Sequence, residues 1–184
     1  APSNLAANIV SATQVDLSWT DNAINETGFV VERADNGGAF ALIATLPADS
    51  VTYSDMTAAA PNSYDYRVAA INGVGQSAYS NVASVSVTVP AAPLNLSATA
   101  LTRTSFTLNW EYPFAQPDGF EIQIATDSTF SAIVQIFPDV GADLTSQSIS
   151  GLSRNTRYFV RIRGFNAVGV GTWSATLEVK TSNK

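Results

Sequence analysis

Polar and apolar residues alternate with a period of two in short runs along the whole chain. Asp16 and Ser18, for example, separate Val15, Leu17 and Trp19. This alternation is typical of a strand with one face in a core. Further runs place the following apolar residues on one face: Phe29 and Val31; Tyr64, Tyr66, Val68 and Ala70; Phe106, Leu108 and Trp110; Phe120, Ile122 and Ile124; Tyr158, Val160 and Ile162. With no competing helical period, the pattern predicts an all-β protein with these residues in its cores.

The chain also repeats itself. The segment 15–19 returns as 106–110, a displacement of 91 residues, whereas Tyr64 returns as Tyr158, a displacement of 94. A fixed displacement between similar segments indicates duplicated domains. The second copy must hold three extra residues upstream of Tyr158, and we expect them in the loop 138–143.

The border between the two copies lies in the segment 89–93, which contains Pro90 and Pro93. Proline fixes φ and has no N–H for a strand ladder, so it ends one sheet and stiffens the connector. We therefore predict two domains, residues 1–89 and 90–184.

Two segments carry a family resemblance. Residues 64–75 read Tyr-Asp-Tyr-Arg-Val-Ala-Ala-Ile-Asn-Gly-Val-Gly, and residues 152–169 hold the same pattern after a Leu-x-x-x-Thr-x-Tyr lead-in. Together with Trp19 and Trp110, these motifs resemble the fibronectin type III domain over nearly the whole chain, twice. The resemblance implies two tandem seven-stranded immunoglobulin-like β-sandwiches, with a tryptophan in each core and a tyrosine corner at Tyr64 and Tyr158. Because Ala58 stands where the second copy has Leu152, we expect the first corner to be less well packed.

Charge and composition exclude several functions. The net charge is −6, with all of it in residues 1–89, so a nucleic acid or an anionic membrane is not an expected partner. The chain has no Cys and no His, which removes thiolate metal sites and the commonest catalytic base. Carboxylate pairs such as Asp21 with Glu26, or Asp118 with Glu121, are better interpreted as solvated loop charges, since a small sandwich has no cleft. We expect no catalytic residue, no metal and no cofactor.

Three arginines, Arg157, Arg161 and Arg163, alternate with apolar residues and so share the outward face of one strand. They could form an anion-binding patch. Arg161, Arg163 and Trp173 also resemble the arginine and tryptophan ladder of cytokine-receptor members of this superfamily, in which guanidinium groups stack on an indole. We favour this structural ladder, with Glu121 as a candidate neighbour. The first copy retains only Arg67 and Tyr79 at the corresponding places, so we expect a weakened ladder there.

Aromatic residues near the surface offer a different function. Trp173, Tyr112 and Phe114 could form a platform that stacks on sugar rings, and the last two lie in a proline-bounded loop, residues 112–117. The same loop could simply cap the end of the core.

The sequence therefore favours a non-catalytic spacer that positions other domains of a larger extracellular protein. The composition resembles that of fibronectin type III modules attached to bacterial carbohydrate-active enzymes and surface adhesins. The expected partners are the neighbouring domains, and the expected state is a monomer with no membrane insertion. The alternative is a module that binds a polysaccharide or a surface protein through exposed aromatic residues.

Overall fold

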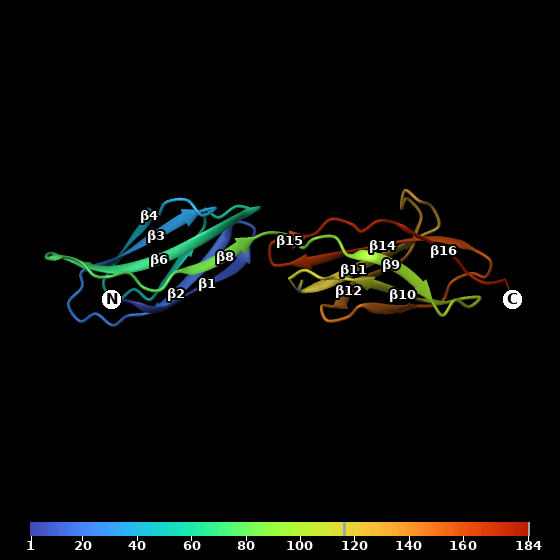
Figure 1. Ribbon diagram of the computed structural model, residues 1–184, viewed down its shortest axis with the longest axis horizontal. Coiled ribbons are helices and arrows are strands. Elements are labelled where there is room, and N and C mark those ends of the chain that lie inside the picture. The colour runs from blue at the N-terminus through green and yellow to red at the C-terminus, as the bar shows by residue number, and fades with distance from the viewer. Residues whose placement is uncertain (116, 184) are drawn as a thin grey trace. The chain divides into compact units, whose positions relative to one another are not determined.

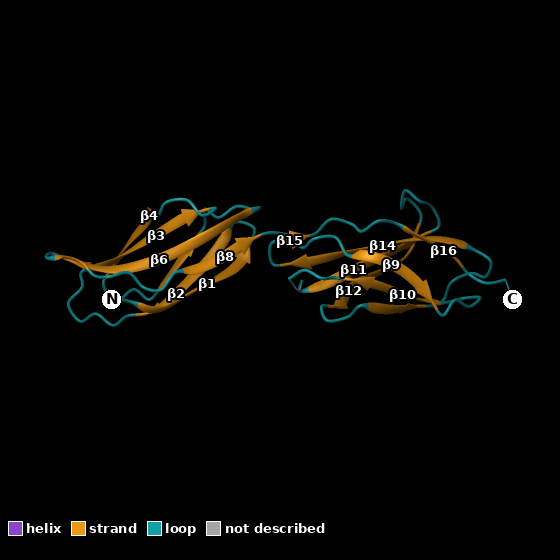
Figure 2. Ribbon diagram, viewed as in Figure 1, coloured by secondary structure: helices purple, strands orange, loops and turns teal. Residues whose placement is uncertain are grey.

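The computed structural model describes residues 1–115 and 117–183. Within these ranges all helix and strand assignments are strands, and none of the described residues forms a helix that could cross a membrane (Figure 2). The chain forms two compact units, Ala1–Thr88 (unit 1) and Val89–Lys184 (unit 2). Val89 is the first residue of unit 2, and its Cγ1 would lie 3.6 Å from a Cβ atom at Gly169.

Unit 1 is a sandwich of two antiparallel sheets (Figure 1). One sheet has the order β1-β2-β5, and the other has the order β4-β3-β6-β7 with β8 also paired to β6. The strands are β1 (Ser3–Ser11), β2 (Gln14–Thr20), β3 (Gly28–Asp35), β4 (Ala41–Pro47), β5 (Thr52–Asp55), β6 (Asn62–Asn72), β7 (Gly75–Gln76) and β8 (Ala83–Val87).

Unit 2 repeats this topology, with the sheets β13-β10-β9 and β12-β11-β14-β15 and with β16 also paired to β14. Its strands are β9 (Leu94–Thr99), β10 (Phe106–Glu111), β11 (Gly119–Ala125), β12 (Ile133–Gly141), β13 (Ser146–Ile149), β14 (Arg157–Asn166), β15 (Gly169–Val170) and β16 (Leu177–Lys180). The duplication seen in the sequence is therefore a duplication of the fold.

Each unit has eight strand segments where seven strands were expected, because the last strand is split in two. β7 and β8 pair with the same strand, β6, and β15 and β16 both pair with β14. A serine hydroxyl replaces the ladder bond at each break. The Ser80 Oγ accepts the Val68 N–H at 3.1 Å, and the Ser174 Oγ accepts the Ile162 N–H at 3.1 Å. This side-chain bond lets the chain leave the ladder without orphaning a buried donor.

The cores contain the alternating apolar residues that the sequence indicated. Trp19 packs against Phe29 with ring centroids 5.9 Å apart, and Trp110 packs against Phe120 at 5.5 Å. Tyr64 and Tyr158 are buried, and their hydroxyls accept the backbone N–H groups of Ala59 (2.9 Å) and Ser153 (2.8 Å). Ala58 and Leu152 are both buried beside these corners.

The expectation that residues 138–143 hold the insertion is wrong. Across the first hairpin Glu32 pairs with Leu42, and across the second Gln123 pairs with Ile136, so the displacement has already grown from 91 to 94 before residue 136. The three extra residues therefore lie in the turn between β11 and β12. That turn contains too few apolar residues for the two copies to be aligned there by sequence.

The connector is packed onto unit 2. Pro90 is buried, and a Cβ atom at Gly171 would lie 2.2 Å from the Pro90 carbonyl oxygen. A Cβ atom at Gly164 would lie 2.9 Å from the Pro90 Cβ and 3.2 Å from the Pro117 Cβ. Two glycines therefore let the connector approach the sheet this closely. In unit 1 the corresponding residues are Ala70 and Ser77, and the Ser77 Oγ itself accepts the Ala70 N–H at 3.0 Å.

Candidate functional site

The outward face of β14 carries both arginines of the predicted ladder. Arg161 and Arg163 alternate with the fully buried Val160 and Ile162, so their side chains leave the core on the solvent side. The guanidinium carbons of both arginines lie over the Trp173 ring, each 4.2 Å from its centroid. Arg157, further along β14, pairs instead with Glu178 at 3.1 Å, and both of these side chains are exposed. The structure thus brings together Arg161, Arg163 and Trp173 and leaves Arg157 apart.

The stack contains two further residues that sequence reasoning missed. Phe130, from the turn between β11 and β12, lies 4.0 Å from the Arg161 guanidinium carbon. Gln123 of β11 accepts the Arg161 Nε–H and Nη2–H with its Oε1, at 3.0 and 2.6 Å. An isolated Phe in a turn carries no periodic signal. Gln123, in contrast, could have been found from the outward alternation of β11.

Arg163 has a carboxylate partner. The Glu121 Oε2 accepts its Nε–H and Nη2–H at 2.9 and 2.7 Å, and the other Glu121 oxygen accepts a hydrogen bond from Gln123. Glu121, one of the acids considered for a catalytic pair, is thereby part of the stack.

Unit 1 has a shorter stack of the same kind. Arg67 lies 3.7 Å from the ring centroid of Tyr79 and 4.1 Å from that of Phe40. Glu32 accepts the Arg67 Nε–H and Nη2–H at 2.8 and 2.6 Å, and its other oxygen accepts the Tyr79 hydroxyl at 2.9 Å. Burial alone would raise the pKa of Glu32, but the hydrogen bonds from Arg67 and Tyr79 lower it below its ordinary value. The Glu32 carboxylate therefore neutralises the positive charge of Arg67 within the stack.

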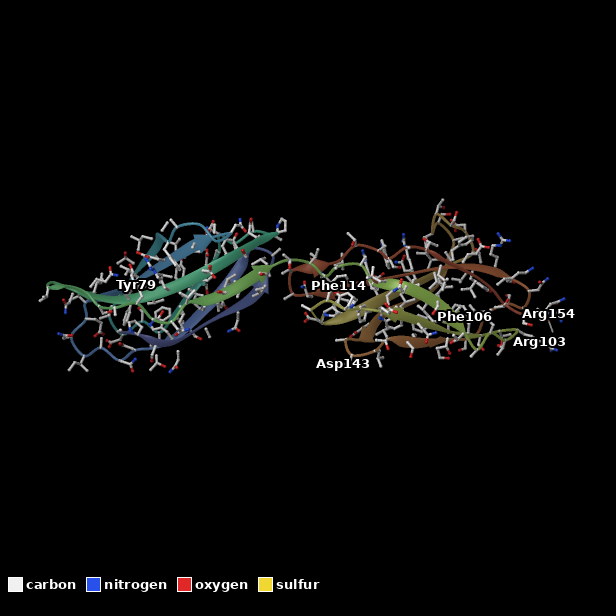
Figure 3. The ribbon with its side chains drawn as sticks, in the orientation of Figure 1. Tyr79, Arg103, Phe106, Phe114, Asp143 and Arg154 are labelled. Atoms are coloured by element: carbon white, nitrogen blue, oxygen red, sulfur yellow. The ribbon has the colours of Figure 1, made fainter. Side chains whose placement is uncertain are left out.

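The aromatic residues proposed for sugar stacking are engaged within unit 2 to different degrees. Two guanidinium groups already lie over Trp173. Tyr112 packs edge-on against Phe120 at 5.2 Å and Phe114 at 5.3 Å, and burial raises the pKa of its phenol. Phe114, labelled in Figure 3, belongs to unit 2. It is 44% exposed. The loop 112–117 includes Gln116, which lies outside the described residues.

Two further groups of carboxylates lie in unit 1. The Asp55 side chain is buried and bonded to Arg33 at 2.8 Å and to the Tyr66 hydroxyl at 2.9 Å, which makes it part of the unit 1 core. Asp21 and Glu26 have carboxylate oxygens within 4.8 Å of each other and of an Asp49 oxygen. These oxygens are the ligand type that hard cations prefer, but the three partly exposed acids alone assign no metal.

A hollow of about 540 Å³ lies beside these acids. It is lined by the loop 22–26, by residues 70–72 and 74–77 around the β6–β7 hairpin, and by Ala1. Its walls include the amide side chains of Asn22, Asn25 and Asn72. The hollow is open, and no nucleophile and base face each other across it at hydrogen-bond distance among the described residues. It offers space for a ligand.

Comparison with known proteins agrees with this architecture. A family model for the fibronectin type III domain matches residues 1–86 and 91–180. Chitinase A1 of Niallia circulans is 30% identical over 98% of the chain, and the ephrin type-A receptor 7 of Gallus gallus is 31% identical over 98% of it. The chain covers 26% and 20% of these two proteins, respectively. A solved segment of two fibronectin type III domains from chicken tenascin has a TM-score of 0.50 at 19% identity, covering 98% of this chain and 99% of that one.

Proposed function

The chain belongs to the fibronectin type III family, and on that premise we propose that it is a non-catalytic spacer that positions neighbouring domains of a larger extracellular protein. Proteins that contain domains of this family include extracellular multidomain proteins. The fold is typically a non-catalytic module, and the absence of histidine removes the most versatile catalytic base.

The observation that carries this proposal is the internal engagement of the polar and aromatic side chains. Arg67, Arg161 and Arg163 all stack on aromatic rings of their own unit. Contacts of this kind across the outer face of a sheet stiffen it, because they fix long side chains that would otherwise be mobile. A stiff surface suits a module that keeps its neighbouring domains at a fixed distance.

The connector supports the same proposal. A linker with Pro90 packed between Gly164 and Gly171 has fewer accessible conformations than a free chain of the same length. We propose that the module is a monomer whose partners are the domains that flank it. The likeness to a bacterial chitinase supports a secreted bacterial protein as its source, with the chain located outside the cell.

A distance measurement tests the spacer function directly. We expect single-molecule energy transfer between dyes at the two ends of the chain to give one narrow distance distribution. A Gly/Ser chain of 184 residues in the same format should give the broad distribution of a flexible coil. An equally broad distribution for the protein would contradict the proposal.

A retention assay tests the alternative, a polysaccharide-binding or surface-protein-binding module. The spacer function predicts that insoluble chitin, cellulose and xylan retain the chain no more than they retain an inert protein. Specific retention that disappears in folded Trp173→Ala or Tyr112→Ala variants would establish the alternative instead.

A further inference from the structure

Both units place one aliphatic residue, one carboxylate or amide, and one arginine in a row across the outer face of the larger sheet. In unit 2 Ile136 pairs with Gln123, and Gln123 pairs with Arg161. In unit 1 the corresponding row is Leu42, Glu32 and Arg67. The aliphatic residue is exposed in both, 51% for Ile136 and 59% for Leu42. The two rows differ in chemistry at only one point, the central residue.

That difference leaves Arg161 of unit 2 without a bonded carboxylate of its own. Gln123 binds the same two nitrogens of Arg161 that Glu32 binds on Arg67, but an amide carries no charge. Among residues 1–115 and 117–183, no carboxylate lies within 4.0 Å of the Arg161 guanidinium. The nearby Glu121 is paired with Arg163 at 2.7 Å. The row and its neighbours in unit 2 therefore combine two guanidinium groups with one carboxylate.

Arg161 is held ready for an anion. Its guanidinium is fixed by contacts with the Phe130 and Trp173 rings, and Gln123 uses only its Nε and one Nη2 donor. A guanidinium has five N–H donors, so the edge formed by Nη1 and Nη2 keeps donors for a carboxylate to bind end-on. Because the side chain is already ordered, binding an anion there costs little conformational entropy.

The surroundings of Arg161 are apolar on one side. Among the strands that the structure describes, β12 pairs only with β11, so its other edge has none of these strands beside it. Val134 and Ile136 of β12 are 48% and 51% exposed, and no charged residue lies between Ile133 and Phe137. Natural proteins usually protect such edges with charges. Arginine and tryptophan next to exposed aliphatic side chains are also the composition typical of protein interfaces.

We propose that the row Ile136, Gln123 and Arg161 of unit 2 is a docking surface for a partner protein that presents a carboxylate side chain next to an apolar one. The positive charge of Arg161 calls for a carboxylate on the partner. The exposed aliphatic residues of β12 favour a partner with an apolar side chain next to that carboxylate. A sugar acid would satisfy Arg161 but would gain nothing from Ile136. This surface is additional to the spacer role and does not depend on it.

The test is an NMR titration of the whole 184-residue chain. The probe is the capped peptide Ser-Glu-Val-Glu-Val-Ser, and a matched peptide with Gln in place of Glu is the control. We expect saturable shifts of the Arg161 Nε–H, the Trp173 indole N–H and the Ile136 amide with the first peptide only, weakened by added salt. Absence of saturable shifts at about 1 mM peptide would overturn the proposal.

Two variants make the test specific. Gln123→Glu gives Arg161 the same carboxylate partner that Arg67 has in unit 1. This variant should weaken peptide binding at least about tenfold, because the new carboxylate neutralises the positive charge of Arg161 that the peptide needs. Glu32→Gln should create a second, matching set of shifts in unit 1. Binding by the Gln123→Glu variant within twofold of the unmodified chain would overturn the proposal.

A third variant separates a protein partner from a sugar. Ile136→Ser should weaken the peptide several-fold, because it removes the aliphatic contact while retaining Arg161. An oligogalacturonate that binds as tightly as the peptide, with no loss in Ile136→Ser, would replace the proposed protein partner by an acidic polysaccharide.

Discussion

The packing of the connector against Gly171 gives a sharp prediction. In the Gly171→Ala variant the new Cβ would lie 2.2 Å from the Pro90 carbonyl oxygen and 3.1 Å from the Pro90 carbonyl carbon. Ordinary van der Waals contact begins at 3.4 Å, so the connector or β15 must move by about 1 Å. Both clashing atoms belong to the backbone, which cannot rotate away as a side chain can.

Two independent estimates of the stability lost in the Gly171→Ala variant agree. Overpacking a well-packed site costs about 1 to 3 kcal/mol. If Pro90 instead lifts off, the unit loses the burial of about three methylene groups, which corresponds to about 2 kcal/mol. We therefore expect Gly171→Ala to lower the free energy of unfolding of unit 2 by about 2 kcal/mol and to leave unit 1 unchanged.

Urea denaturation followed by tryptophan fluorescence and calorimetry measures this change, since unit 2 contains Trp110 and Trp173 and unit 1 contains Trp19. Gly73→Ala in unit 1 is the matched control, because a Cβ there meets nothing within 4 Å. It should change the stability of unit 1 by less than about 0.5 kcal/mol. A Gly171→Ala variant with an unchanged unit 2 transition would refute the account of the connector as a packed part of that unit.

Three further variants probe other contacts. Trp173→Ala removes two cation–π contacts of about 0.5 to 1 kcal/mol each, so it should destabilise unit 2 by at least about 1 kcal/mol in urea denaturation; no change would mean that the stack is incidental. Tyr158→Phe should cost about 1 kcal/mol in the same assay through the lost Ser153 hydrogen bond, and an effect below about 0.3 kcal/mol would show that the corner bond is dispensable. Asp55→Asn leaves Arg33 without its buried carboxylate and should destabilise unit 1 by about 3 kcal/mol. Burial alone would raise the pKa of Asp55, but bonds from Thr57, Arg33 and Tyr66 lower it below its ordinary value, so the stability it provides is present above about pH 4 and is lost as the pH falls below that. Calorimetry of unit 1 between pH 6 and 2 should show a steeper loss in the unmodified protein than in Asp55→Asn, and parallel curves would contradict this assignment.

The sequence predicted the parts of the fold that depend on local alternation. Trp19, Trp110, Tyr64 and Tyr158 stand in strands whose period of two decides which face is buried, and that period can be read without any tertiary information.

The parts that the sequence did not predict depend on loops and on close backbone approach. Phe40 and Phe130 reach their arginines from hairpin turns of different length, and a single apolar residue in a turn has no period to identify it. The role of Gly164, in β14, and of Gly171, just after β15, appears only when Pro90 is placed against them. From the sequence alone, a glycine is usually interpreted as a requirement for backbone freedom.

The replacement of Ser77 by Gly171 also affects how the protein can be divided. Unit 1 fills this position with its own side chain, whereas unit 2 fills it with a carbonyl group from upstream of its first strand. A gene fragment cut at the start of β9 would encode all strands of unit 2 and still omit a piece of its packing. The connector from Val89 onward is therefore part of unit 2. It has to be included when unit 2 is expressed alone or exchanged with another domain by recombination.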